Sequence, residues 1–256
     1  MISRTEVIYV CIPAHDEATT LGVLLWKTRK VLGEFKRDYR VVVHDDASTD
    51  GTLDVLERYR RALPLTVLRT ESRLGYGRSV ETLLRHVLDE SAYPKRDCAV
   101  VLQGDFTENP QDIVALVKVL EGGADIVAGC VAINGSPHPR GVKVARWVAG
   151  NLLRSVVRRA PVSDPLSGMR AYRVIVLRKA FRDRPADEPL IQQDGWAANV
   201  ELLGVLAPHA RRIEETALAL RYDLQVRPSR FRPIRTLMSL ARIPGSVWTT
   251  SATEAA

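Results

Sequence analysis

Cysteine is scarce in this 256-residue chain, and long apolar runs are missing. Cys11, Cys98 and Cys130 form neither a CxxC pair nor a metal-ligand spacing, so we expect reduced thiols in a cytoplasmic protein. The N-terminus has none of the basic start, apolar stretch and small-residue cleavage site of a signal peptide. No apolar run reaches the roughly 18 residues of a membrane-spanning helix. The sequence therefore predicts a soluble protein with at most peripheral contact at the inner face of a membrane.

Internal repeats and low-complexity stretches are also missing. The hydrophobic fraction of 46% and the charged fraction of 26% are those of a globular protein. The formal net charge of +7 fits a phosphate-rich partner such as nucleic acid, an anionic membrane or a nucleotide diphosphate, although a bias toward arginine would give the same charge. Because no recognised nucleic-acid-binding module is present, we expect no nucleic acid partner.

Short apolar runs alternate with helical patterns along the first half of the chain. This alternation predicts an α/β fold, with a mostly parallel sheet and helices on both faces. Ligands of such sheets bind beyond the carboxyl ends of the strands. The expected strands are 7–12, 39–43, 65–68, 99–102 and 126–128, and the expected helices are 19–32, 52–62, 79–88 and 111–120.

Polar clusters follow three of these strands, at 14–17, 45–50 and 103–109. Asp45 and Asp46 could cap the next helix, but adjacent carboxylates repel each other, and the pair could instead hold a base edge and a ribose. Asp105 could be a turn residue, or it could bind the Mg²⁺ or Mn²⁺ that neutralises a departing diphosphate.

Another dense polar segment covers residues 163–170. Asp164 could be a general base that deprotonates an acceptor hydroxyl, and Arg170 could pair with phosphate. A surface loop with a solvated arginine would have the same composition. Gly75-Tyr76-Gly77 lacks the third glycine of a dinucleotide fingerprint and predicts a turn into a helix.

In their order, these segments resemble the inverting GT-A glycosyltransferases of family 2, and most of all the polyprenyl-phosphate (dolichol-phosphate) mannose and glucose synthases. Residues 12–17, IPAHDE, are similar to the family's IPAYNE, and residues 43–52, VHDDASTDGT, to VVDDGSTDGT. Residues 102–106, LQGDF, lie where the family has MDADL, and residues 163–172, SDPLSGMRAY, are similar to SDPTSGFRAY. The resemblance covers residues 6–230.

The resemblance implies a GT-A fold and transfer of a sugar from a nucleotide diphosphate-sugar, with Mg²⁺ or Mn²⁺ as the cofactor. It implies catalytic roles for Asp164 and Arg170 and metal ligation by Asp105 and Gln103. The nucleotide-sugar would contact Pro13, Ala14, Glu17, Asp45, Asp46, Gly104 and Asp105. The acceptor or phosphate side would contain Lys143, Ser167, Glu201, Ser229 and Arg230.

The sequence departs from the synthases at the metal and acceptor motifs. Gln103 replaces the first carboxylate of the metal motif, which should weaken Mg²⁺ binding because hard cations prefer anionic oxygen. Cys130 and Lys143 stand where the synthases have arginines implicated in gripping the lipid phosphate. The acceptor is therefore either a polyprenyl phosphate or a soluble small molecule. The alternatives are a nucleotide-sugar binding protein without turnover and a nucleotidyltransferase, although residues 14–17 are acidic where the latter would have a basic, glycine-rich loop.

The strand–helix alternation ends near residue 224, which predicts a catalytic domain at 1–224 and a basic C-terminal extension at 225–256. In this extension, apolar residues recur at helical spacing among several arginines. We expect this apolar face to pack on the catalytic domain, and weak contact with an anionic membrane is the alternative. The face consists of Ile234, Leu237, Met238 and Ala241.

Overall fold

A seven-stranded sheet in the order β3-β2-β1-β4-β6-β5-β7 forms the centre of the protein. The computed structural model describes residues 6–131, 162–182, 188–218, 238–240 and 242–243. Six of the seven strands run in the same direction, and β6 is antiparallel to both of its neighbours. The strands are β1 (Val7–Ala14), β2 (Asp38–Asp46), β3 (Leu65–Thr70), β4 (Cys98–Val101), β5 (Ile126–Val131), β6 (Arg170–Arg173) and β7 (Ile213–Leu218).

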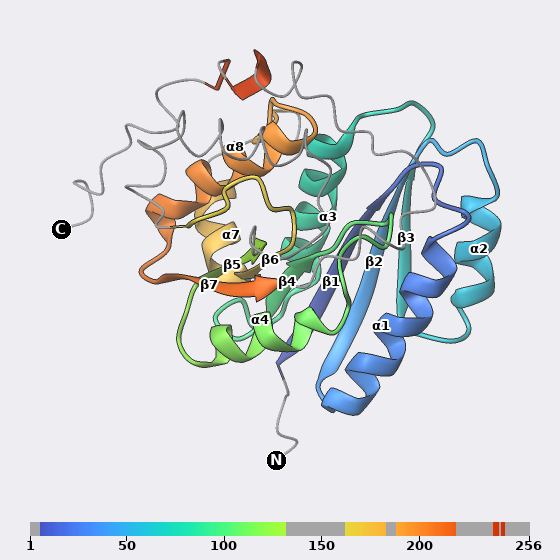
Figure 1. Cartoon of the computed structure of the whole chain (residues 1–256), viewed down its shortest axis with the longest axis horizontal. Helices are drawn as coiled ribbons and strands as arrows, with labels where there is room; N and C mark the ends of the chain where they lie inside the picture. The colour runs from blue at the N-terminus through green and yellow to red at the C-terminus, as the bar shows by residue number, and fades with distance from the viewer. Residues whose placement is uncertain (1–5, 132–161, 183–187, 219–237, 241, 244–256) are drawn as a thin grey trace.

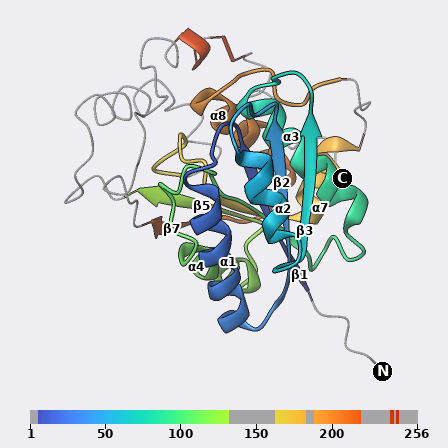
Figure 2. The same ribbon diagram turned by 90° about the vertical axis from the view of Figure 1, so that its right-hand side faces the viewer.

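Helices cover both faces of the sheet (Figures 1 and 2). One face is covered by α1, α2 and α4, and the other by α3, α7 and α8. The helices are α1 (Leu21–Phe35), α2 (Thr52–Tyr59), α3 (Tyr76–Glu90), α4 (Asp112–Glu121), α7 (Val174–Phe181) and α8 (Trp196–Leu206), and a 3-10 turn, η1 (Ala207–His209), follows α8.

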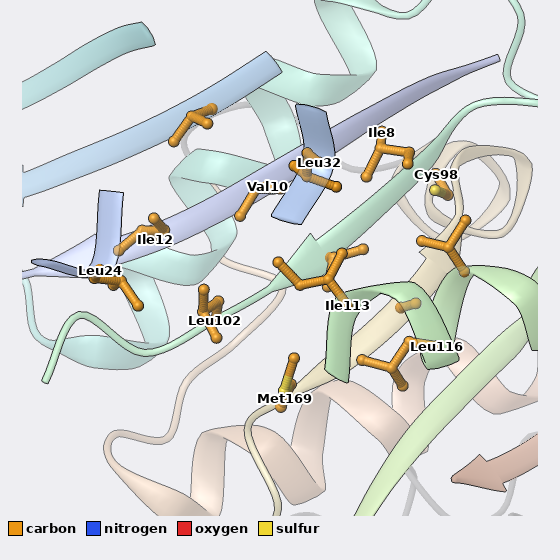
Figure 3. Close-up of a cluster of buried hydrophobic side chains, with 14 of the residues drawn as sticks. Ile8, Val10, Ile12, Leu24, Leu32, Cys98, Leu102, Ile113, Leu116 and Met169 are labelled. Carbon is orange, nitrogen blue, oxygen red and sulfur yellow. The ribbon is translucent and has the colours of Figure 1, made fainter. Parts of the chain in front are cut away.

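Alternation of side chains along β1 divides the core into two layers. Ile8, Val10 and Ile12 pack against α1 and α4, as Figure 3 shows, whereas Tyr9 and Cys11 point to the opposite face. Since both faces are buried, β1 is apolar throughout, as is usual for a central parallel strand. The core therefore fixes the register of β1, and with it the position of the loop that follows.

The expected α/β architecture is confirmed, and the five expected strands and four expected helices all form. The expected turn at residues 75–77 also forms, because Gly75, at φ 91°, directly precedes α3. No pattern in the sequence predicted β6, whose four residues include Arg170 and Arg173. Arg173 can lie in a strand because its guanidinium donates hydrogen bonds to the backbone carbonyls of Leu120, Ala124 and Lys95.

Two apolar residues near the C-terminus pack on α8. Leu240 and Ile243 are buried in a cluster with Leu166, Ala197 and Val200. Met238, by contrast, is 54% exposed, and the other members of the expected apolar face, at positions 234, 237 and 241, lie outside the described residues. The division at residue 224 stays a prediction. Among the helices that the structure describes, none is long and apolar enough to cross a membrane.

Glu81 joins α3 to the segment before α8. Its buried carboxylate accepts hydrogen bonds from the backbone N–H groups of Leu190 and Ile191, at 3.0 and 3.1 Å, and it also pairs with Arg78 and Arg85. A buried carboxylate with four partners fixes two segments that are far apart in the sequence.

Replacing Glu81 by alanine should therefore lower the free energy of unfolding by about 3 kcal/mol, because buried N–H groups lose their acceptor. Urea denaturation measures this change. The matched control is Glu57→Ala, which removes an exposed i,i+3 partner of Arg60 and should cost about 0.5 kcal/mol or less. Equal effects of the two substitutions would show that Glu81 is not a structural anchor.

Candidate functional site

The loops that follow β1 and β2 are bound to each other by side chain–backbone hydrogen bonds. Ser48 Oγ accepts the N–H of Asp16 at 2.9 Å, and Thr52 Oγ1 accepts the N–H of Glu17 at 2.8 Å. In return, Oδ1 of Asp16 accepts the N–H of Thr49 at 2.8 Å. The two polar clusters that the sequence placed after neighbouring strands therefore form one structure at the carboxyl edge of the sheet.

The loop after β4 approaches the same structure through Gly104. A Cβ atom at this position would lie 3.1 Å from the carbonyl oxygen of Pro13 and 3.4 Å from Cγ of Glu17. Oγ1 of Thr20 lies 3.0 Å from the carbonyl oxygen of Gly104 and 3.1 Å from Oε2 of Glu17, so its single hydrogen is shared between these two acceptors. A glycine is needed here because a side chain would hold the two loops apart.

Each of these three loops contains a non-glycine residue in the left-handed region. Asp16 follows β1 with φ 52°, Ala47 follows β2 with φ 53°, and Phe106 follows β4 with φ 62°. Such backbone is uncommon outside glycine and costs about 1–2 kcal/mol for each residue. Strained residues at the ends of three neighbouring strands mark this edge as a candidate functional site.

Asp45 and Asp46 are both buried, and they differ in their partners. The carboxylate of Asp46 accepts the N–H groups of Leu74 and Gly75, at 2.6 and 2.9 Å, and so holds the loop that leads into α3. Oδ1 of Asp45 accepts the N–H of Ser48, whereas Oδ2 has no hydrogen-bond partner among the described residues. Half-exposed Arg69 lies 3.4 Å from that oxygen without hydrogen-bond geometry.

The expected metal ligands lie in the loop after β4. Oδ1 of Asp105 accepts hydrogen bonds from the backbone N–H and the hydroxyl of Thr107, and Oδ2 accepts none from the residues described. Gln103 lies beside buried Glu108, whose Oε2 accepts the backbone N–H of Gln103 at 2.8 Å. Within the described ranges no three His, Cys, Asp or Glu side chains converge. One carboxylate and one amide fit a divalent ion that takes its remaining ligands from phosphate and water.

The loop that leads into β6 reaches this edge because β6 runs antiparallel, so that Arg170 pairs with Val101 at the end of β4. A Cβ at Gly168 would lie 2.8 Å from Nε2 of Gln103 and 2.9 Å from the hydroxyl of Tyr76. Asn199 ties the loop down: Oδ1 accepts the Tyr76 hydroxyl at 2.9 Å, and Nδ2 donates to the Leu166 carbonyl at 3.0 Å. Burial raises the pKa of Tyr76, so the phenol stays protonated as a donor.

The four loops at the carboxyl edge of the sheet lie within the part of the chain that matches a known protein family. The family model for glycosyl transferase family 2 matches residues 9–181, which include all four loops. The chain belongs to glycosyl transferase family 2. The resemblance noted in the sequence is thereby confirmed at the level of the family.

The curated relatives of this chain are distant from it in sequence. It is 26% identical over 189 residues to an undecaprenyl-phosphate 4-deoxy-4-formamido-L-arabinose transferase of Pseudomonas fluorescens, covering 72% of this chain and 52% of that protein. It is also 26% identical over 178 residues to a dolichol-phosphate mannosyltransferase of Pyrococcus furiosus, covering 65% of this chain and 46% of that protein. The chain thus spans about half the length of the curated relatives it matches.

Solved structures of similar fold support the GT-A assignment. A glucosyl-3-phosphoglycerate synthase from Mycobacterium tuberculosis, in complex with Mn²⁺, UDP and phosphoglyceric acid, superposes with a TM-score of 0.64 at 22% identity, covering 97% of this chain and 80% of that one. Residues 1–349 of TarS from S. aureus give a TM-score of 0.54 at 19% identity, covering 96% and 73%. At these identities the likeness shows the fold alone.

Two residues expected to contact substrate are buried and bind the protein's own backbone instead. The guanidinium of Arg170 is fully buried and donates to the carbonyls of Asn199 and Pro165, at 2.5 and 2.6 Å. Buried Glu201 accepts the N–H groups of Gln192 and Gln193. Their expected contacts with substrate therefore stay predictions that the geometry does not favour.

The remaining expected residues are divided between the site and the undescribed segments. Asp164 and Ser167 are buried in the loop before β6, and the N–H of Ser167 donates to the Asp164 carbonyl at 3.3 Å. Cys130, at the end of β5, places Sγ 2.7 Å from Oγ of Ser163, and that hydroxyl also lies 3.0 Å from the Glu215 carboxylate. Lys143, Ser229 and Arg230 lie outside the described residues.

Asp194 was not expected from the sequence. This exposed carboxylate lies beside the first turn of α3, where a Cβ at Gly75 would come within 3.0 Å of Oδ1, and Oδ1 accepts the N–H of Gly77 at 3.3 Å. A Cβ at Gly77 would lie 2.3 Å from the Gln193 carbonyl oxygen, so the glycines of residues 75–77 admit the Asp194 segment. In the sequence, only Gly75 and Gly77 could have indicated that another segment packs against the start of α3. They could not identify Asp194, because it lies more than a hundred residues further along the chain.

Ala47 gives a direct test of strain at the site, because the family motif has glycine there. Ala47→Gly should raise the free energy of unfolding by about 0.5 kcal/mol, since relief of the left-handed backbone exceeds the entropy lost with glycine. Ala115→Gly, in the middle of α4, is the control and should lower it by about 1 kcal/mol. Destabilisation of equal size by both changes in urea denaturation would rule out strain at Ala47.

Proposed function

We propose that this chain is an inverting glycosyltransferase that moves a sugar from a nucleotide diphosphate-sugar to an acceptor. The arrangement that supports this most directly is the unsatisfied Oδ2 of Asp45 at the same sheet edge as Asp105. This oxygen has an ion pair with Arg69 but no hydrogen bond from the described residues, and an N–H on the edge of a uracil or guanine base would supply one. The side chain of Arg69 is half exposed, and we infer that it moves aside to admit the base.

The diphosphate of the donor would then lie over the loop after β4. Asp105 offers Oδ2, which accepts no hydrogen bond from the described residues, to a divalent ion, and Gln103 can add a neutral oxygen. When bound, Mg²⁺ or Mn²⁺ would neutralise the charge that develops on the departing nucleotide diphosphate. The structures of M. tuberculosis glucosyl-3-phosphoglycerate synthase with UDP and either Mn²⁺ or Mg²⁺ support this choice of ions.

Transfer would be a single displacement at the anomeric carbon. An acceptor oxygen forms the new bond as the bond to the diphosphate breaks, and the nucleotide diphosphate leaves with the electron pair. If the acceptor is a hydroxyl, its proton must pass to a carboxylate, and Asp164 and Asp194 are the candidates that the loop before β6 and the start of α8 supply. A phosphate acceptor is already anionic and needs no such base.

The acceptor can be proposed only as two classes. Sequence relatives that act on undecaprenyl phosphate and dolichol phosphate support a polyprenyl phosphate. The similar fold crystallised with phosphoglyceric acid supports a soluble acceptor. The Cys130–Ser163–Glu215 cluster disfavours an anionic acceptor of either class, because the Glu215 carboxylate would repel it. A nucleotide-sugar binding protein without turnover remains the alternative function, and hydrolysis of the donor would exclude it.

The metal prediction concerns Gln103. Gln103→Asp should tighten Mn²⁺ binding in the presence of UDP by about tenfold, because a second anionic ligand joins Asp105. Electron paramagnetic resonance of free Mn²⁺ gives this affinity without an activity assay. Gln111→Asp, the same change at an exposed residue just before α4, should leave it unchanged. Equal Mn²⁺ affinity in Gln103→Asp and the unaltered protein would remove Gln103 from the metal site, and unaltered affinity in Asp105→Asn would remove Asp105.

The base prediction separates the acceptor classes. With a hydroxyl acceptor, Asp164→Asn or Asp194→Asn should lower kcat by about a hundredfold or more, while the dissociation constant for UDP stays the same. With a polyprenyl-phosphate acceptor, both variants should keep kcat within about threefold, because the nucleophile carries no proton to remove. Steady-state rates with each acceptor class, together with UDP titration calorimetry, measure both quantities. Loss of UDP binding in either variant would contradict the proposed separation of donor and acceptor groups.

A further inference from the structure

The outer face of α1 exposes a tryptophan and a valine one helical turn apart. Val23 is 52% exposed and Trp26 is 54% exposed, although burial of either would be favourable by about 1.5–3 kcal/mol. The inner face of the same helix is fully buried through Leu21, Leu24 and Leu25. Two large apolar side chains adjacent on one helix face form a small patch, not scattered exposure.

Basic residues follow these two side chains along α1. Arg29 and Lys30 are exposed, and Nζ of Lys30 lies 5.9 Å from the centre of the Trp26 ring. The whole stretch from Leu21 to Gly33 contains no acid, and Glu34 is the first. An indole flanked by cations is the combination that soluble proteins place at the head-group level of anionic membranes. We define Val23, Trp26, Arg29 and Lys30 as the α1 patch.

The α1 patch lies next to the proposed donor site. Lys27, the neighbour of Trp26, places Nζ 5.6 Å from the centre of the Phe106 ring, in the loop that contains Asp105. The first turns of α1 also follow directly from the interlocked loop at residues 15–20. Contact of the α1 patch with a surface would therefore bring the loops after β1 and β4 close to that surface.

We propose that the α1 patch binds an anionic membrane surface, with the Trp26 indole at the interface and Arg29 and Lys30 on lipid head groups. Charge complementarity favours this occupant, because the two cations of the patch and neighbouring Lys27 repel a basic partner, and Leu21–Gly33 contains no acid. The patch is also too small for a stable dimer, which buries roughly 800 Å² on each partner. Weak, reversible membrane binding needs only one inserted aromatic and a few charges. This inference is independent of which acceptor the enzyme uses.

The test is co-sedimentation of the full chain with vesicles of phosphatidylcholine alone or mixed with phosphatidylglycerol. Arg29→Glu/Lys30→Glu should lower partitioning onto the anionic vesicles by at least about tenfold. The matched control, Lys95→Glu/Lys179→Glu, makes the same charge change at exposed residues before β4 and on α7, which covers the opposite face of the sheet, and should lower it far less. Lys27 is left unaltered because it contacts Phe106 at the donor site.

Tryptophan fluorescence tests the insertion of Trp26. Anionic vesicles should shift the emission of the unaltered protein to the blue, and Trp26→Phe should remove most of that shift. The proposal is overturned if the α1 variants partition like the unaltered protein, or if the two double variants fall equally, which would indicate general electrostatics. It is also overturned if Trp26→Ala changes the molar mass in solution without changing partitioning, because the patch would then be an interface between copies of the chain.

Discussion

Backbone N–H groups at the carboxyl edge of the sheet must find acceptors, and side chains of the loop after β2 provide them. Ser48 and Thr52 bind the backbone of Asp16 and Glu17, and Asp16 binds the N–H of Thr49 in return. This interlock sets the path of both loops, and Gly104 can approach Pro13 only because that path is fixed. The position of Asp105 beyond Gly104 therefore depends on hydrogen bonds made by residues that would not touch a metal.

Polar residues shared with the family motifs hold the backbone of the site more than they line it. Asp46 fixes the loop into α3, Glu201 fixes residues 192 and 193, and Arg170 joins the Pro165 and Asn199 carbonyls. Each is buried, and a buried ionisable group needs several hydrogen bonds to offset its desolvation. Such a motif in a sequence therefore indicates loop geometry first, and the proposed chemistry is assigned to a smaller set that includes Asp105, Asp164 and Asp194.

Helices and strands that form because of their own residue pattern could be predicted from the sequence. The apolar run in β1 and the helical spacing in α1 predicted their elements within a few residues, because burial on both faces or on one face sets each pattern. β6 could not be predicted, since Arg170 and Arg173 belong in a strand only where remote carbonyls receive their guanidinium groups. Asp194 was missed for a similar reason: its position is set by packing against Gly75 and Gly77, to which no local pattern connects it.

β6 lies between β4 and β5 in the sheet, although it follows both in the chain. During synthesis, β1 to β4 can pair among themselves as soon as residue 101 has emerged, but one edge of β4 then stays open until Arg170–Arg173 arrives. An open strand edge is a template for pairing with other chains. The order of translation therefore leaves the nascent N-terminal half exposed to misassembly for about seventy residues of elongation, the separation in sequence of β4 from its late partner.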